Sequence, residues 1–325
     1  MNSTETRSTA IRCDSLVRQF NGTTAVNGVD LEIEEGEIYG FLGPNGAGKS
    51  TTVRMLCTLL APTSGRAIVA GFDIATEPGA VRLRIGVALQ EAALDPRQTG
   101  SELLTLQGRL YGLSRAETRR RVAGLGELID IGDALDRRIS TYSGGMKRRL
   151  DLAAALVHDP QILFLDEPTT GLDPVSRVRV WEEVRRLNAD LGMTIFLTTQ
   201  YLEEADELAG RVGIIDHGRI VAEGTPTELK RSVGSDMIVA RLDGEARQVC
   251  ALVEHLPGVL GVEAHFDELL VSAEDGPATI SPVAVSLSNC GVPIRDLTLR
   301  TPTLDDVFLE LTGSRIQQDV NEEVA

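Results

Sequence analysis

The sequence of 325 residues is poor in aromatic side chains, which make up 4% of it, and its four cysteines are widely scattered. The spacing of Cys13, Cys57, Cys250 and Cys290 fits no metal-ligand pattern, so we expect reduced and mostly buried thiols. No apolar run approaches the ~20 residues that span a bilayer, and residues 1–16 lack the apolar core of a signal peptide. We therefore expect a chain that is at most peripheral to a membrane.

Basic residues are also scarce, with 32 Lys and Arg against 48 Asp and Glu and a formal net charge of −16. A protein that binds nucleic acid along its whole length is usually basic, so this balance argues against a nucleic-acid partner. The densest basic clusters are at 119–121 and 147–149, and the first is typical of a solvated helix face.

Residues 11–230 alternate strand-like and helix-like segments, which predicts an α/β domain with a mostly parallel sheet. Ile38–Leu42 and Ile162–Leu165 are continuous apolar runs, as expected of buried parallel strands. Between them, residues 92–158 are rich in Leu, Arg and Glu with helical periodicity, which predicts an inserted helical subdomain. The polar ends, residues 1–10 and 314–325, are predicted to be disordered.

A polar segment with Gly and Pro, "AEGTPTELKRSVGSD", follows the α/β domain and indicates a domain boundary. Beyond it we expect a small α+β domain over 235–313. Its predicted elements are a strand at 237–242, a helix at 246–255, a strand or hairpin at 262–272, a helix at 280–288 and a strand at 294–299.

The segment "EIYGFLGPNGAGKSTTVRML" contains a phosphate-loop pattern between a strand and a helix. Glycines let the backbone N–H groups turn toward phosphate oxygens, and the positive end of the following helix adds to the attraction. Lys49 is expected to reach the β- and γ-phosphates, and the Ser50 hydroxyl to ligate Mg²⁺. The predicted nucleotide-binding residues here are Gly43, Pro44, Asn45, Gly46, Ala47, Gly48, Lys49, Ser50 and Thr51.

A second motif, "ILFLDEP", ends an apolar strand with two carboxylates. Asp166 is placed to hold Mg²⁺ directly or through water. Glu167 can accept a proton from an attacking water, or orient it. The phosphate loop and this motif together predict hydrolysis of a nucleoside triphosphate.

Between the two motifs lies "TYSGGMKRRLDLAAAL", which resembles the signature segment of the ATP-binding-cassette (ABC) family. Ser143, Gly144 and Gly145 match that signature, whereas Tyr142 and Met146 replace its usual Leu and Gln. Ser143 and Gly145 at the start of a helix can form a second anion site. In the family this site contacts the γ-phosphate that is bound by the other cassette of a head-to-tail dimer.

The resemblance covers residues 10–225 and implies further roles. Phe20 matches the aromatic residue that stacks on adenine, a contact that tolerates guanine as well. Gln90 matches the glutamine that approaches Mg²⁺ and the attacking water, and Asp173 matches the aspartate that communicates across the dimer. The implied fold is a phosphate-loop NTPase cassette with antiparallel N-terminal strands, an inserted helical subdomain and bound ATP and Mg²⁺.

Gln200, in "TIFLTTQYLEEAD", occupies the position of the histidine that donates a hydrogen bond to the γ-phosphate in most cassettes. A glutamine amide can still donate to phosphate, but it cannot carry a proton charge. The surrounding segment resembles the daunorubicin/doxorubicin-resistance ATP-binding subunits, in which Gln is usual here. "TPTLDDVFLELTG" resembles the same subfamily, whose C-terminal extension is implicated in assembly; alternatively, it is an amphipathic last helix that buries Leu304, Val307, Phe308 and Leu311.

The resemblance implies an ATP-hydrolysing subunit of an exporter of drug-like compounds, in which two copies bind a separate membrane permease at the cytoplasmic face. Glu167 and Gln200 are expected to assist hydrolysis, and residues 92–104 beside Gln90 to dock the permease. Two alternatives stay open. One is an ABC ATPase that acts in translation or DNA maintenance, and the other is a nucleotide-gated drug-binding protein.

Overall fold

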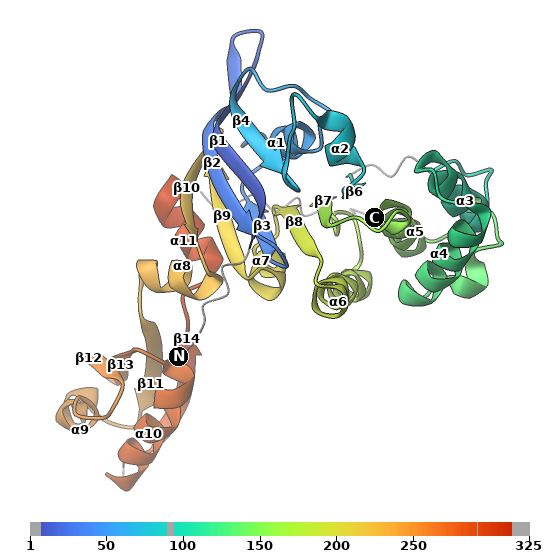
Figure 1. The fold of residues 1–325 in the computed structure, drawn as a ribbon. Helices are drawn as coiled ribbons and strands as arrows, with labels where there is room; N and C mark the ends of the chain where they lie inside the picture. The colour runs from blue at the N-terminus through green and yellow to red at the C-terminus, as the bar shows by residue number, and fades with distance from the viewer. Residues whose placement is uncertain (1–7, 90–93, 291, 314–325) are drawn as a thin grey trace, which may run out of the picture. The chain divides into compact units, whose positions relative to one another are not determined.

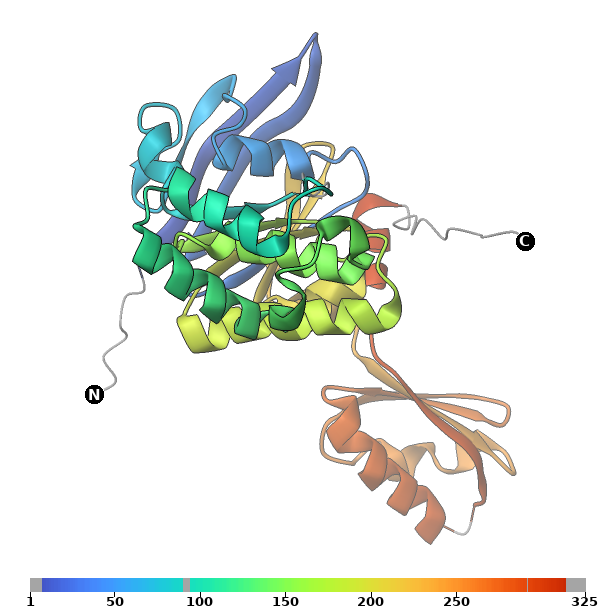
Figure 2. The same cartoon turned by 90° about the vertical axis from the view of Figure 1, so that its right-hand side faces the viewer.

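A computed structural model describes residues 8–89, 94–290 and 292–313, and its fold is shown in two views (Figures 1 and 2). The chain divides into two compact units, a larger one that ends at Pro226 and a smaller one that begins at Thr227. The division lies in the segment where the composition of the sequence changes. The larger unit contains two sheets and the smaller unit one, and each unit has its own buried core.

The larger unit is built on a sheet of six strands in the order β10-β9-β3-β8-β7-β6, in which only β10 is antiparallel to its neighbour. Every residue of β3, β7 and β8 is buried, as expected for central strands that are covered on both faces. The strands are β3 (Ile38–Leu42), β6 (Ile85–Ala88), β7 (Ile162–Asp166), β8 (Thr194–Thr199), β9 (Arg211–Asp216) and β10 (Arg219–Gly224).

A second, antiparallel sheet has the order β2-β1-β4-β5. Its strands are β1 (Thr9–Phe20), β2 (Thr23–Glu34), β4 (Ser64–Val69) and β5 (Phe72–Asp73). Thr9 and Ala10, which the sequence pattern placed in a disordered terminus, belong to β1, and Ala10 is buried. That prediction was wrong because the apolar residues of β1 continue to Ala10 and pack against the core. Residues 1–7 and 314–325 lie outside the described residues.

Helices in the connections between strands cover the two faces of the central sheet (Figure 1). Helix α1 (Lys49–Leu56) follows β3, α2 (Pro78–Arg82) precedes β6, α6 (Pro174–Leu191) follows β7, and α7 (Leu202–Leu208) follows β8. The carboxyl ends of β3, β7 and β8 therefore open onto turns that lead into helices. In open α/β sheets, ligands bind at this edge.

The inserted segment contains α3 (Gly100–Leu110), α4 (Arg115–Leu128) and α5 (Gly144–Leu156), with 3₁₀ turns at Gly132–Ala134 and Ile139–Thr141. Capping boxes formed by Thr99 with Glu102 and by Ser114 with Glu117 fix where α3 and α4 begin. Figure 1 shows α5 next to β6, with α3 and α4 farther from the sheet.

Between α8 and α11, the smaller unit has the order of elements βαββαβ, and its sheet has the order β12-β13-β11-β14 with all neighbours antiparallel. Helices α9 and α10 contribute Val253, Val283 and Leu287 to its core. The elements are α8 (Pro226–Val233), β11 (Asp236–Leu242), α9 (Cys250–Val253), β12 (Val259–His265), β13 (Glu268–Ala273), α10 (Gly276–Asn289), β14 (Ile294–Arg300) and α11 (Leu304–Thr312).

Two details of the smaller unit differ from the sequence-based expectation. The helix predicted at 246–255 is broken into a 3₁₀ turn (Ala246–Gln248) and the single turn of α9, separated at the β-branched Val249. In α11, Leu304, Val307 and Phe308 are buried, but Leu311 is 43% exposed. Leu311 lies in the last turn, two residues before the cap at Gly313, so its position on the apolar stripe does not ensure burial.

The four thiols are free, and their burial differs. Cys13 and Cys57 are buried, Cys250 is half-buried and Cys290, which follows α10, is exposed. Burial raises the pKa of Cys13 to about 12 and raises the pKa of Cys57 well above its usual value.

Candidate nucleotide-binding and hydrolysis site

The loop between β3 and α1 has the backbone that the phosphate-loop pattern predicts. Gly46 and Gly48 have φ angles of 82° and 110°, a region that L side chains disfavour. Gly43 is needed for a different reason than the curled backbone we expected. A Cβ atom at Gly43 would lie 2.3 Å from the carbonyl oxygen of Ile215, so only glycine permits the close approach of β9.

The loop surrounds a cavity of about 360 Å³. The predicted residues that line it are Pro44, Asn45, Gly46, Gly48, Lys49, Ser50 and Thr51, and they are joined by Ala25 and Glu167. Ala47 is not among the lining residues and is buried, and its backbone carbonyl accepts a hydrogen bond from the Gly218 N–H. Ala47 and Gly43 thus belong to the loop but do not line the cavity.

Lys49 is held inside this loop, with an exposed fraction of 4%. Its Nζ donates to the carbonyl oxygens of Gly43 at 2.6 Å and Pro44 at 3.2 Å, and lies 3.4 Å from Glu167 Oε1. Burial lowers the pKa of Lys49, and the nearby Glu167 and Asp166 carboxylates oppose that effect. The positive charge is therefore fixed at the cavity wall, between the backbone carbonyls and the Glu167 carboxylate.

Asp166 and Ser50 meet at the end of β7. The Ser50 hydroxyl donates to Asp166 Oδ1 at 3.2 Å, and the Thr198 hydroxyl donates to the same oxygen at 2.5 Å. Thr198 also accepts a hydrogen bond from the Glu167 N–H at 3.1 Å. The sequence motifs did not indicate a role for Thr198. A signal was present nevertheless, because neighbouring parallel strands bring Asp166 and Thr198 into register.

Glu167 has a φ of 50°, an uncommon conformation for a residue other than glycine. Its exposed fraction is 8%, and its Oε2 accepts a hydrogen bond of 3.4 Å from the Thr170 hydroxyl. Backbone strain of this kind persists where the surroundings fix it, and such positions cluster at active sites. The turn after β7 thus aims the carboxylate at the cavity that Lys49 lines.

Gln200 directly follows β8, next to the same edge of the sheet. Its side chain is buried, with an exposed fraction of 3%. Its Oε1 has no hydrogen-bond partner among the residues that the structure describes. Burial without a partner is costly for an amide oxygen. Gln90, the other predicted glutamine, lies outside the described residues.

The signature segment forms a second helix start, separate from the phosphate cavity. Ser143 caps α5 by accepting a hydrogen bond of 3.3 Å from the Met146 N–H, and Asp173 caps α6 by accepting one of 2.9 Å from the Ser176 N–H. Hydrogen bonds from Ser176 lower the pKa of Asp173. Ser143, Gly144 and Asp173 do not line the cavity around Lys49. Gly145 lies beside α6, since a Cβ there would meet Ser176 Oγ at 3.3 Å.

The two departures from the signature pattern have structural roles. Tyr142 is buried, and its hydroxyl donates to the Ala134 carbonyl oxygen at 2.5 Å. Met146 is partly buried against a core cluster that the helical subdomain shares with the central sheet. Phe20, at the end of β1, is 40% exposed, with the guanidinium of Arg18 4.5 Å from the centre of its ring.

Two models of protein families match the chain. The ABC transporter model matches residues 26–170, and a model of the C-terminal domain of DrrA1-3-like ATP-binding proteins matches residues 224–312. The daunorubicin/doxorubicin resistance ATP-binding protein DrrA of Streptomyces peucetius is 49% identical over 329 residues, which cover 100% of this chain and 98% of that protein. The chain belongs to the ABC transporter family, as an ATP-binding subunit.

Other comparisons agree with this membership. The daunorubicin resistance ATP-binding protein DrrA3 of Streptomyces coeruleorubidus is 48% identical and covers 94% of this chain, and the match spans 96% of that protein. A solved structure described as the ATP-binding subunit of an ABC transporter matches with a TM-score of 0.62 and 28% identity, and covers 69% of this chain and 92% of its own.

The cassette is thus an ATPase of the ABC type, and it binds nucleotide. Its fold, a mostly parallel sheet with antiparallel N-terminal strands and an inserted helical subdomain, is confirmed. No helix within the described ranges is long and apolar enough to cross a membrane.

Proposed function

We propose that this cassette powers the export of a drug-like compound through a separate membrane permease, from the cytoplasmic face of the membrane. The observation that carries the proposal is the similarity over the whole chain, smaller unit included, to proteins named for daunorubicin resistance. The buried residues Lys49, Asp166 and Glu167 provide the charged groups that ATP hydrolysis by such a subunit needs.

In this proposal each residue around the cavity has one task. The N–H groups of the Gly43–Gly48 loop and the start of α1 bind phosphate oxygens. Lys49 exchanges its contacts with the loop carbonyls for the β- and γ-phosphates. Glu167, fixed by its strained turn and by Thr170, accepts a proton from the attacking water. Thr198 keeps Asp166 and Glu167 in place.

Magnesium fits the residues at the end of β7. A serine hydroxyl and a carboxylate meet there at 3.2 Å, and both are oxygen ligands of the kind that Mg²⁺ prefers. Within the described residues, no group of three or more His, Cys, Asp and Glu could hold a metal alone. Ser50 and Asp166 would therefore share the ion with the phosphates, which is the usual arrangement for Mg²⁺. The bound ion would neutralise charge on the transferred phosphoryl group.

Gln200 is proposed to replace the usual histidine. An amide group can donate to the γ-phosphate, and the unsatisfied Oε1 can accept from the water that attacks it. We propose that Gln90 approaches the same water and Mg²⁺, as the family resemblance implies.

The signature residues are proposed to act in a second copy of the chain. Ser143 and Gly144 are exposed and do not line the cavity around Lys49. A head-to-tail dimer with two-fold symmetry would place them, with Gly145 and Asp173, against the nucleotide of the partner. Phe20 would stack on the base.

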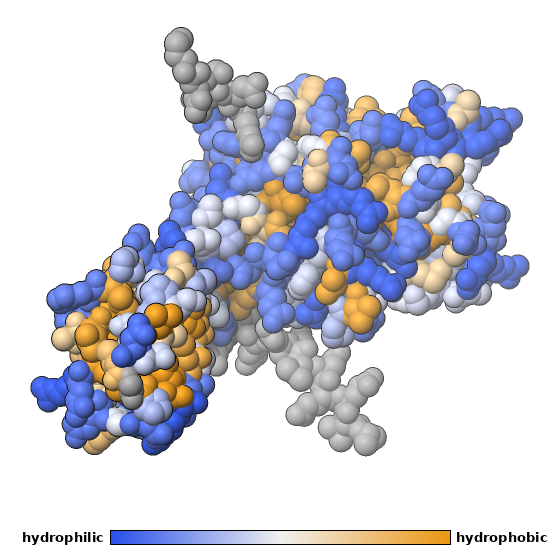
Figure 3. Space-filling view, turned by 90° about the horizontal axis from the view of Figure 1, so that it is seen from below, coloured by the Kyte–Doolittle hydropathy of each residue, from blue (hydrophilic) through white to orange (hydrophobic). Residues whose placement is uncertain are grey.

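The smaller unit is proposed to assist assembly. Figure 3 shows apolar side chains gathered on the face of this unit that is turned toward the viewer. The large exposed apolar side chains of the unit include Leu252, Leu260, Phe266 and Val285. An apolar surface of this kind is typical of a contact with another protein.

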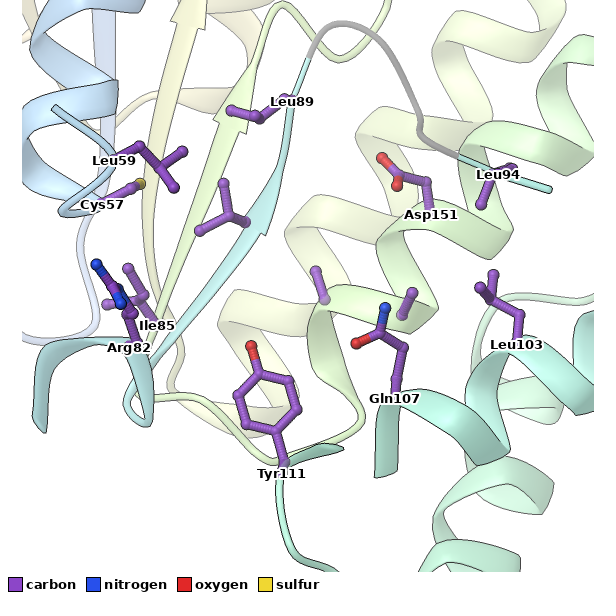
Figure 4. Close-up of a pocket in the computed structure, with 13 residues that line it drawn as sticks. Cys57, Leu59, Arg82, Ile85, Leu89, Leu94, Leu103, Gln107, Tyr111 and Asp151 are labelled. Atoms are coloured by element: carbon purple, nitrogen blue, oxygen red, sulfur yellow. The ribbon is translucent and has the colours of Figure 1, made fainter. Parts of the chain in front are cut away.

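We propose that the permease binds in a groove beside α3. The groove has a volume of about 370 Å³, and Figure 4 shows side chains from α3, α5 and β6 facing it. Leu94 and Leu103 line it and belong to the segment 92–104 that we predicted as the docking surface. Residues 92 and 93 lie outside the described residues.

The test compares ATP hydrolysis and transport by the wild-type protein and by Glu167→Gln. Each is added to inverted membrane vesicles with and without the membrane protein that co-purifies with the chain, and uptake of daunorubicin is followed by its fluorescence. We expect turnover that rises with this permease and drives uptake. Glu167→Gln should bind ATP but hydrolyse it about 100-fold more slowly. Glu203→Gln, an exposed carboxylate on α7, is the matched control.

Daunorubicin uptake that does not depend on ATP, or full turnover by Glu167→Gln, would contradict the proposal. If the permease stimulates turnover but daunorubicin is not taken up, the chain would still be the ATPase of a transporter. Daunorubicin-like compounds would then be excluded as its substrate.

A further inference from the structure

Arg148 connects the signature helix α5 to two strand ends. Its Nε donates to the Pro168 carbonyl oxygen at 2.9 Å, and its Nη1 donates to the Leu89 carbonyl oxygen at 2.7 Å. Pro168 follows Glu167 directly, and Leu89 follows the end of β6. The guanidinium therefore fixes the turn that carries the hydrolytic carboxylate, although it lines neither the phosphate cavity nor the groove beside α3.

The third contact of Arg148 leads to that groove. Its Nη1 lies 3.4 Å from Oδ2 of Asp151, one turn farther along α5. Asp151 lines the groove, and Figure 4 shows its carboxylate facing the same space as the Gln107 amide and the Tyr111 hydroxyl. Arg148 thus contacts both Asp151, which lines the groove, and Pro168, in the turn after Glu167.

Asp151 is the one acidic residue among those that line the groove in the described part of the chain, and most of the others are apolar. Arg82 is the one basic residue of that lining, and it donates to the hydroxyl and carbonyl oxygens of Thr58. A mostly apolar wall with one carboxylate fits an apolar segment that carries one Lys or Arg.

The Asp151–Arg148 contact leaves both charges poorly compensated. The side chains are only 15% and 11% exposed, and the contact is long at 3.4 Å. Burial raises the pKa of Asp151 to about 6 and lowers the pKa of Arg148. The Nη2 of Arg148 also has no hydrogen-bond partner among the residues that the structure describes. A cation that arrives in the groove would therefore gain a partially desolvated carboxylate.

We propose that Asp151 binds a basic side chain of the docked permease segment, and that Arg148 transmits this event to the turn that carries Glu167. The proposal rests on the permease assignment above. When Asp151 pairs with the incoming cation, its hold on Arg148 weakens. Arg148 then holds the Leu89 and Pro168 carbonyls more firmly, so that Glu167 stays in its hydrolytic position. Arg148 is thus a positioning residue that couples docking to hydrolysis.

The central test uses Asp151→Asn, which keeps the shape of the side chain and removes its charge. The readout is the ratio of kcat with permease vesicles to kcat without them, together with KM for ATP. We expect the ratio to fall about 5-fold or more, with little change in KM, because Asp151 does not line the phosphate cavity. Asp190→Asn, an exposed residue on α6, is the control and should keep the wild-type ratio.

A second variant tests the link without removing Asp151. Gln107→Lys places a cation on the wall of the groove that faces Asp151. It should raise turnover in the absence of permease and lower the stimulation that the permease adds.

The outcomes separate the two proposals. An unchanged ratio in Asp151→Asn together with normal turnover of Gln107→Lys would overturn the link and leave the permease assignment intact. A wild-type protein that no permease vesicle stimulates would overturn both, since no docking event would then reach Glu167.

Discussion

The phosphate loop and the signature segment both place small residues and N–H groups at the start of a helix, but their surroundings differ. At the phosphate loop, Lys49 and Glu167 are buried and lie 3.4 Å apart. At the signature segment Ser143 is exposed, as is Asp173 at the start of α6, and each bonds only its own helix start in the contacts described above. The first region is built within one chain, whereas the second presents its donors outward, as an interface requires.

The largest effect is expected in the buried region. Lys49→Ala removes the one ammonium that lines the phosphate cavity within the described residues, so turnover should fall about 100-fold or more. Steady-state ATP hydrolysis measures this, and Lys230→Ala in the smaller unit serves as the matched control. Normal turnover of Lys49→Ala would refute the assignment of the cavity.

Mixing two inactive variants sharpens the comparison. Ser143→Glu should also be inactive, because it places a negative charge at the exposed helix start. If the sites form between two copies, an equal mixture of Lys49→Ala and Ser143→Glu contains heterodimers with one intact site. About a quarter of the wild-type sites are then restored. A mixture without activity would show that each chain completes its own site.

A smaller effect is expected for Gln200, which is buried like Lys49 but has an unsatisfied amide oxygen. Gln200→Ala removes a hydrogen bond to a charged group, worth roughly 1.5–3 kcal/mol, which corresponds to about 10–150-fold in kcat if it is felt fully in the transition state. Gln200→His should retain activity, since imidazole can donate the same bond. An alanine variant with full activity would mean that the amide takes no part.

The last prediction concerns the stability of the protein and not its turnover, at the contact between α5 and α6. Glu183 on α6 lies 4.0 Å from Arg149, and burial raises the pKa of Glu183 to about 7. A carboxyl group whose pKa is raised in the folded state stabilises the protein below its unfolded pKa of about 4.5, and this contribution is lost as the pH rises through about 7. Glu183→Gln should therefore stabilise the protein by up to about 3 kcal/mol at pH 8 and by less than about 1 kcal/mol at pH 5.

Thermal unfolding at the two pH values measures this difference, with the exposed neighbour Glu182→Gln as the control. An equal shift at both pH values would assign the effect to packing, not to charge.

The sequence predicted those parts of the molecule that depend on local pattern. The buried strands β3 and β7 and the start of α1 at Lys49 follow from apolar runs and from the phosphate-loop spacing. Features that depend on distant contacts were missed. The role of Thr198 depends on the register of two strands, and the need for glycine at position 43 depends on the Ile215 carbonyl of another strand.

The same limit explains the errors in the smaller unit. Periodicity placed Leu311 on the buried stripe of α11, but it cannot tell where the packing partner of a helix ends. Composition predicted a continuous helix at 246–255, although Val249 interrupts it. Arg148 shows the limit in the site, because in the sequence it is one of three adjacent basic residues, and only the fold directs it to Leu89 and Pro168.

The uneven burial of the four thiols has a practical consequence for spectroscopy. Cys13 and Cys57 are buried, and their raised pKa values disfavour the thiolate that reacts with a maleimide dye. Cys290 is exposed and belongs to the smaller unit, so brief labelling should place most of the dye there. A fluorophore at Cys290 would let the rotational freedom of the smaller unit be followed by anisotropy during turnover, in the unaltered sequence.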